Sequence, residues 1–185
     1  MTKIKIILML TLLLQVFSMT AQRRLSGMNG IYAYGGMIES THGLHGGLAY
    51  SKYLKNQNQL SYEASYLQKN YSYKDMKIPL MQFTIESVFH KNFFMDKTRS
   101  FFASASIGGA FGYEAINLNR KLLPDGAAIL NKDAVLYGAT FAIHTEYYYD
   151  DRYVILFGVK QRALGGSTVT NFHTQFYLGF KYILL

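Results

Sequence analysis

The sequence contains no cysteine, no tryptophan and only two prolines in 185 residues. Without cysteine, the chain cannot form a disulfide framework, a thiolate zinc site, a cysteine nucleophile or the lipidated amino-terminal cysteine of a lipoprotein. The residues that are abundant are 16 tyrosines, 13 phenylalanines and 16 glycines. Because aromatic side chains suit a pleated surface, this composition favours β structure.

Beyond its amino terminus, the chain also lacks any apolar run approaching the length of a membrane-spanning helix. The start resembles an export signal, with Lys3 and Lys5 before an apolar run over 6–17 and a cleavage site near Ala21. We predict a cleaved signal peptide at 1–21 and a single domain at 22–185. The alternative is a retained amino-terminal anchor helix. An exported chain of this kind can span a membrane only as a β-barrel.

Most of the remaining sequence alternates with a period of two, which is typical of β-strands. The last stretch is the clearest example, because every second residue from Phe172 to Leu184 except Thr174 is aromatic or aliphatic. Strands of this kind are predicted at Asn29–Ile38, Gly43–Leu54, Gln59–Gln68, Ile78–His90, Ser100–Tyr113, Ala134–Tyr148, Tyr153–Leu164 and Phe172–Leu184. Segments 69–77 and 91–99 are predicted to be connections.

Alternation alone is equally compatible with a soluble sandwich or barrel and with a membrane barrel. Three features favour an eight-stranded antiparallel up-and-down transmembrane β-barrel. The polar series is dominated by small residues, which fit a narrow lumen. Tyrosines gather near strand ends, as in interfacial girdles: Tyr50, Tyr53, Tyr62, Tyr66, Tyr113, Tyr147, Tyr148, Tyr149, Tyr153 and Tyr182. The last strand also carries a partial form of the terminal assembly signal of outer-membrane barrels: Tyr177, Gly179, Tyr182 and Leu184.

In such a barrel the polar series points inward, and charges of both signs meet in a low-dielectric lumen. We predict a lumen charge network that pairs and fills the barrel: Glu63, Glu86, His144, Glu146, Lys160, Arg162 and Lys181. A proton or ion pathway is the alternative use of these residues. His144 and Glu146 could also be metal ligands or an acid/base pair, but two ligands are too few for a closed metal site. No metal or other cofactor is expected.

Two other classes of function are less favoured by the sequence. An outer-membrane enzyme acting on lipid would need a serine near His144 and Glu146, and Ser167, in Gly-Gly-Ser-Thr, is more simply a turn residue. A nucleic-acid-binding protein is suggested only by the formal net charge of +8, because the basic residues do not follow one stripe or motif. Contact of basic turns with anionic lipid explains that charge equally well. We therefore expect neither an enzyme nor a direct nucleic-acid contact.

Four short segments carry a family resemblance. They are Tyr73 to Leu80, Gly112 to Asn117, Leu123 to Leu130 and Asp151 to Val154. With the export signal, the length and the segment order, they resemble the conjugative transposon protein TraO family over most of the mature chain. One departure is 163–166, where a tryptophan would be expected before the glycine.

The resemblance implies a component of the cell-envelope apparatus that passes a mobile element's DNA to a recipient, and it implies no catalytic residue. We predict an outer-membrane protein whose partners are membrane lipid, the barrel assembly machinery and other proteins of the apparatus. The long segment Glu114–Asp133 is the candidate partner loop, with Glu114, Asn117, Arg120, Lys121, Asp125 and Gly126. The alternatives are a loop that only caps the barrel, and a soluble exported β-barrel that binds a small ligand or a partner subunit.

Overall fold

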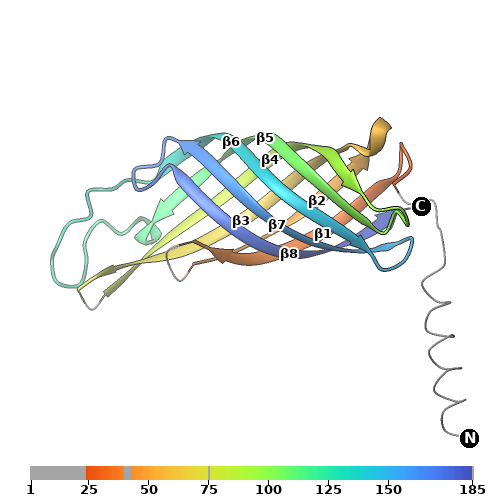
Figure 1. Ribbon diagram of the computed structural model, residues 1–185. Helices are drawn as coiled ribbons and strands as arrows, with labels where there is room; N and C mark the ends of the chain where they lie inside the picture. The colour runs from red at the N-terminus through yellow and green to blue at the C-terminus, as the bar shows by residue number, and fades with distance from the viewer. Residues whose placement is uncertain (1–23, 40–42, 75, 185) are drawn as a thin grey trace, which may run out of the picture.

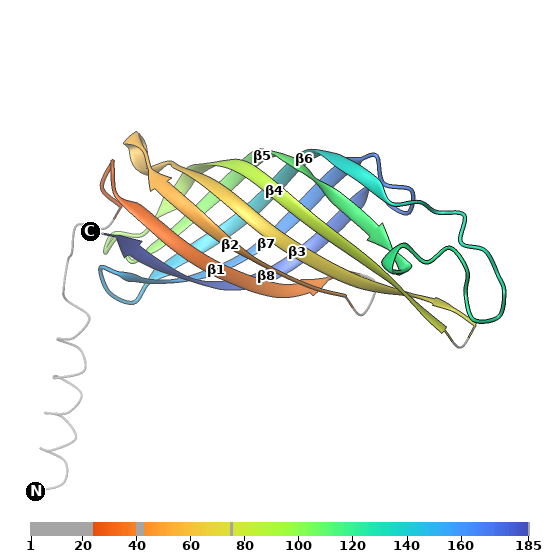
Figure 2. The ribbon, with the colours of Figure 1, turned by 180° about the vertical axis from the view of Figure 1, so that it is seen from behind.

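A computed structural model of the protein describes residues 24–39, 43–74 and 76–184, so the predicted signal peptide at 1–21 lies outside the described residues. Eight strands follow one another: β1 (Asn29–Ile38), β2 (Gly43–Tyr53), β3 (Gln59–Tyr73), β4 (Met76–Met95), β5 (Phe101–Ile116), β6 (Ala134–Tyr148), β7 (Tyr153–Gly165) and β8 (Phe172–Leu184). Each pairs antiparallel with the next, and β8 pairs with β1, so the sheet closes (Figures 1 and 2). The predicted eight-stranded antiparallel up-and-down barrel is confirmed. Among these residues, no helix has the length and hydropathy needed to cross a membrane.

The two ends of the barrel differ. β1 starts and β8 finishes at one end, which we call the terminal end, together with the short connections 54–58, 96–100 and 149–152. The opposite end, which we call the loop end, carries the connections 117–133 and 166–171 and the projecting β3–β4 hairpin (Figure 1). Short turns at one end and longer loops at the other are typical of outer-membrane barrels.

Three strands, β3, β4 and β5, extend at least three residues beyond a predicted end, and β7 extends one residue. β3 and β4 pair from Gln59 with His90 to Tyr73 with Met76, so the predicted connection at 69–77 is wrong. β4 continues to Met95, which shortens the predicted connection at 91–99. β5 continues to Ile116, which shortens the predicted loop at 114–133. In each case the backbone hydrogen bonds with the neighbouring strand continue past the predicted end of the strand, because pairing satisfies backbone groups whatever the local composition.

The apolar series of each strand faces outward and the polar series inward. In β8, for example, Phe176, Leu178 and Phe180 are exposed, whereas Gln175 and Lys181 are buried. The outer wall therefore consists largely of exposed Leu, Ile, Phe and Tyr side chains. The polar and charged side chains occupy the lumen.

The tyrosine girdle prediction is wrong for two residues. Tyr53 and Tyr148 point into the lumen and are fully buried, with their hydroxyl oxygens 2.8 Å apart. Their hydroxyls lie beside a buried carboxylate, so these rings belong to the polar interior. Outward tyrosines, such as Tyr50, Tyr62 and Tyr147, remain on the wall.

Glycine allows the first and last strands to approach closely where the barrel closes. A Cβ atom on Gly36 of β1 would lie 1.8 Å from the carbonyl oxygen of Phe176 in β8, whereas one on Gly109 of β5 would meet open space. We expect Gly36→Ala to lower the free energy of unfolding by about 1–3 kcal/mol, because β1 and β8 must move apart to accept the methyl group. Gly109→Ala is the matched control. Urea unfolding followed by circular dichroism in detergent tests this, and equal stability of the two variants would contradict it.

Candidate functional site

The lumen gathers the charged side chains predicted from the sequence. The structure places Glu63, Glu86, His144, Glu146, Lys160, Arg162 and Lys181 inside the barrel, all of them buried. They come from β3, β4, β6, β7 and β8, and in each strand they belong to the inward series. They form two ion clusters with a pair of histidines between them.

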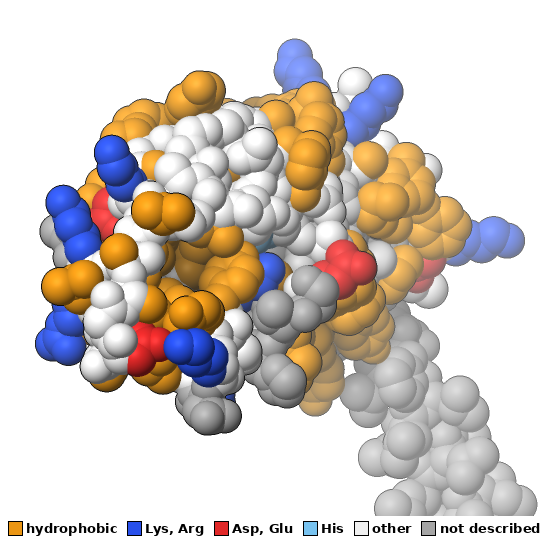
Figure 3. All heavy atoms as spheres, turned by 90° about the vertical axis from the view of Figure 1, so that its left-hand side faces the viewer, with side chains coloured by type: hydrophobic (Ala, Val, Ile, Leu, Met, Phe, Trp, Pro, Cys, Tyr) orange, Lys and Arg blue, Asp and Glu red, His pale blue; other side chains and the backbone are white. Residues whose placement is uncertain are grey.

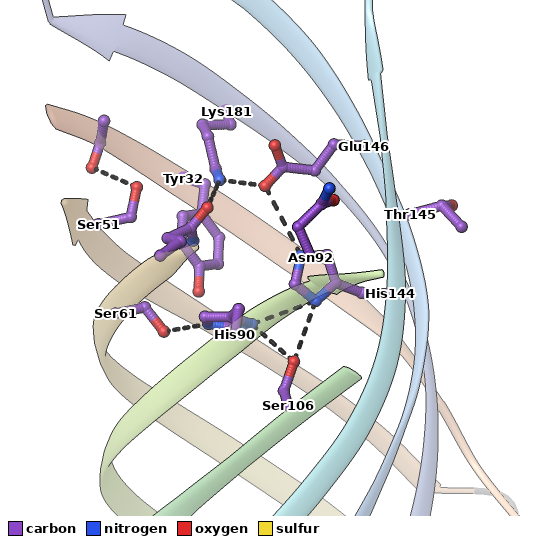
Figure 4. Close-up of polar contacts among 12 residues, drawn as sticks. Tyr32, Ser51, Ser61, His90, Asn92, Ser106, His144, Thr145, Glu146 and Lys181 are labelled. Carbon is purple, nitrogen blue, oxygen red and sulfur yellow. Dashed lines mark hydrogen bonds and ion pairs between the residues drawn. The ribbon is translucent and has the colours of Figure 1, made fainter. Parts of the chain in front are cut away.

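The cluster nearer the terminal end centres on Glu146 (Figure 4). Its carboxylate oxygens lie 2.5 Å from Lys181 Nζ and 2.8 Å from an Arg24 guanidinium nitrogen. The hydroxyl of Tyr53 donates to the same carboxylate at 3.1 Å. One buried anion therefore faces two buried cations, so each of these cations has a counter-charge in the low-dielectric interior.

Arg24 was not predicted to take part, because it precedes the first predicted strand, which begins at Asn29. Its guanidinium group also donates to Asn92 Oδ1 at 3.1 Å and stacks 4.2 Å from the ring centroid of Phe102. Burial disfavours its charge, but the charge and hydrogen bond of Glu146, with Tyr53 and Tyr148, together outweigh that cost and raise the pKa of Arg24 above its ordinary value. Arg24 therefore closes the terminal end of the lumen from within.

The second ion cluster lies nearer the loop end and joins β3, β4 and β7. Lys160 Nζ lies 2.6 Å from Glu63 and 3.3 Å from Glu86, and Arg162 pairs with the other oxygen of Glu86. The hydroxyls of Tyr32 and Tyr34 donate to Glu63 at 2.8 and 2.9 Å. Two anions and two cations thus balance one another.

His90 and His144 lie between the two clusters, and Figure 4 shows them beside Glu146 of the first cluster. Their Nδ1 atoms lie 3.2 Å apart, and His90 also contacts the hydroxyls of Ser61 and Ser106, each at 2.7 Å. Ser61, which contacts His90, donates to Glu63 of the second cluster at 3.0 Å. His144 Nε2 lies 3.7 Å from Glu146. Within the described residues, no group of three or more His, Cys, Asp or Glu side chains is arranged to hold a metal ion.

The lumen has almost no free space at this level. A cavity of about 10 Å³ remains among Tyr32, His90, Tyr177 and Lys181, which is roughly room for one water. Side chains, rather than solvent, therefore fill the barrel between the clusters. This arrangement can stiffen the barrel, but it leaves no room for a substrate beside His144 and Glu146.

The predicted partner loop is shorter than expected. Glu114 is an inward residue of β5, fully buried, and accepts hydrogen bonds from Gln82 and from Ser167 at 2.8 and 3.0 Å. Its assignment to the loop is therefore wrong. β5 continues to Ile116, and Glu114 faces inward like Gly112, two residues before it in the strand. The hydrogen bond to Glu114 gives the Ser167 hydroxyl a structural role.

The other predicted loop residues, Asn117, Arg120, Lys121, Asp125 and Gly126, lie in the connection 117–133. Asp125 is held by Lys74 of the β3–β4 turn at 2.8 Å, and hydrogen bonds from Lys74 and from the Ala127 backbone lower the pKa of its carboxyl. Ile129 packs on the buried cluster of Ile38, Leu67, Leu80 and Ile116. Part of the loop therefore caps the lumen, while its basic residues remain exposed.

The proposed assembly signal is divided between the two faces of β8. Tyr177 and Gly179 face the lumen, while Tyr182 and Leu184 face outward. A Cβ atom on Gly179 would lie 2.9 Å from the Ala33 carbonyl oxygen and from Tyr34 Cβ, so a larger residue would disturb the β1–β8 seam. Whether assembly machinery reads these residues stays a prediction.

Together, the closed sheet, the apolar wall and the ion-paired interior define a small β-barrel with a filled lumen. Its fold resembles those of the outer membrane protein OprG and the amino-terminal β-barrel domain of OprF, both from Pseudomonas aeruginosa, and of the attachment invasion locus protein Ail of Yersinia pestis. Identities are 13%, 11% and 10%, and TM-scores are 0.53, 0.53 and 0.56. The alignments cover 87%, 86% and 86% of this chain and 98%, 98% and 100% of those chains.

The sequence matches the family described as conjugative transposon protein TraO over residues 22–184. The chain belongs to the TraO family, as its sequence resemblance indicated. No curated protein matches the sequence.

Proposed function

We propose that this protein is a β-barrel of the bacterial outer membrane that serves as a structural and interaction component of a conjugative transposon's transfer apparatus. The observation that carries the membrane assignment is the inverted distribution of side chains. Large apolar residues, such as Phe111 and Leu178, are exposed around the wall, while the ion pairs are buried inside. Exposing such a wall to water would cost free energy, whereas lipid is a favourable environment for it. Closure of the sheet pairs the backbone groups of neighbouring strands, as the lipid environment requires.

This distribution disfavours a soluble exported barrel, which would place the aromatic series inside and the charged series outside. The TraO family membership supports the role in conjugation. The filled lumen supports a structural role in place of an enzymatic one, because His144 and Glu146 are already engaged in the ion and histidine network.

We propose three kinds of partner. Membrane lipid surrounds the wall, barrel assembly machinery inserts the chain, and other proteins of the apparatus contact the exposed loop 117–133. No direct contact with nucleic acid is proposed.

Fractionation and gel migration test the membrane assignment. We expect the protein to fractionate with the outer membrane and to migrate differently on gels before and after heating, because a closed barrel resists detergent until it is heated. Recovery of the folded protein from the soluble periplasm would refute this assignment.

Gene deletion and complementation test the role in transfer. We expect deletion to abolish or sharply lower transfer frequency, and the full chain to restore it. A variant lacking residues 118–129 should remain heat-modifiable but fail to restore transfer, because it loses most of the loop while all eight strands stay intact. Full rescue by this folded variant would contradict a docking role for the loop.

A further inference from the structure

The connection 117–133 forms a hollow of about 390 Å³ at the loop end of the barrel. We call this hollow the loop pocket. Its lining includes Arg120, Lys121, Lys132, Asp133, Ile116 and Leu130. It is separate from the ion clusters of the lumen, and it lies at the end where Lys and Arg side chains project around the rim (Figure 3).

Hydrogen bonds give the loop pocket a defined shape. Asp133 accepts from the backbone N–H of Ile116 at 2.8 Å, and the Ile129 N–H donates to the Lys121 carbonyl at 2.8 Å. The side chain of Asn131 donates to the Thr168 carbonyl at 2.6 Å, which ties this segment to the β7–β8 connection. The pocket is thus built from both ends of the loop and braced by a second loop.

The charge of the loop pocket is unbalanced. Arg120, Lys121 and Lys132 contribute three cations, and in the described part of the chain none of them forms an ion pair with a carboxylate. Among the described lining residues, Asp133 is the only acidic one, and its two oxygens already accept from the Ile116 N–H and from the Tyr113 hydroxyl. The pocket therefore attracts an anion.

An apolar surface adjoins these cations. Leu130 is 88% exposed, so its side chain has little protein to cover it. The Tyr113 hydroxyl reaches Asp133 in the pocket, while Tyr113 itself lies opposite Val135 on the outer wall, with both side chains about half exposed. A molecule in the pocket can therefore extend an apolar part along the wall.

We propose that the loop pocket binds a phosphate-bearing anionic membrane lipid. The phosphate lies among Arg120, Lys121 and Lys132, which suit it by charge and hydrogen bonding. The acyl chains lie over Leu130, Tyr113 and Val135. DNA offers the anion but no apolar partner for Leu130, so the lipid fits the pocket better. This inference rests on the membrane placement proposed above.

Native mass spectrometry of the folded full chain in a neutral detergent tests the proposal. We expect phosphatidylglycerol to bind at least about tenfold more tightly than zwitterionic phosphatidylcholine. The triple variant R120Q/K121Q/K132Q should weaken phosphatidylglycerol binding by about tenfold or more. The matched control K55Q/K97Q/R99Q removes three cations from connections at the terminal end, and it should change binding by less than about twofold.

Leu130→Glu provides a second variant that does not depend on the triple substitution, because its exposed side chain makes little contribution to folding. It should also weaken phosphatidylglycerol binding. Equal binding of the two lipids, or equal loss in the triple and control variants, would overturn the proposal. Pocket-dependent binding of a short DNA duplex, or of inorganic phosphate as tightly as lipid, would also overturn it. Heat-modifiability and fractionation are measured separately, so failure of the membrane assignment is distinguishable from failure of lipid binding.

Discussion

Replacing Glu146 with glutamine is expected to lower the free energy of unfolding by about 3–5 kcal/mol. The substitution keeps the size of the side chain but removes the negative charge that faces Lys181 at 2.5 Å and Arg24 at 2.8 Å. Two buried cations would then lack a counter-charge, which costs far more than a single lost hydrogen bond. Urea titration of the folded barrel in detergent measures this change.

Glu39→Gln is the matched control for this prediction, because Glu39 is exposed just beyond β1, and its change should stay within about 0.5 kcal/mol. The double variant Glu146→Gln with Lys181→Met should recover part of the loss, since it removes one of the stranded cations. If Glu146→Gln were as stable as Glu39→Gln, the cluster at the terminal end would not be a stabilising element.

Replacing Leu178 with arginine is expected to block insertion or to destabilise the inserted barrel by about 2–4 kcal/mol, the cost of such a charge near the bilayer midplane. Leu178 lies midway along β8, points outward and is 62% exposed, with Gly35 and Phe157 opposite it in the neighbouring strands. Folding titrations into lipid vesicles, followed by the heat-dependent gel shift, measure the effect.

Leu118→Arg makes the same chemical change at a similarly exposed residue in the loop outside the wall. This control should insert and fold like the original chain. Normal insertion of Leu178→Arg would show that the wall of β8 does not face lipid, and it would contradict the membrane placement on which the lipid pocket rests.

The alternation of residue types predicted a large part of this fold. The bounds predicted for β1, β6 and β8 agree with the structure, and the fold class is confirmed. Residues such as Lys160 and Lys181 could be assigned to the inside because successive side chains in a strand point to opposite faces, which is a local property of the backbone. The sequence by itself therefore determined the strands and the two faces of the wall.

Only the tertiary structure decided which inward residues meet. Arg24 reaches Glu146 across 122 positions, and Tyr53 meets Tyr148 across 95 positions. These contacts depend on the stagger of neighbouring strands around the closed barrel and on where the chain enters it. The alternation of residues within one strand predicts neither. The same reason explains Glu114, whose place in the lumen follows from how far the pairing of β4 with β5 extends.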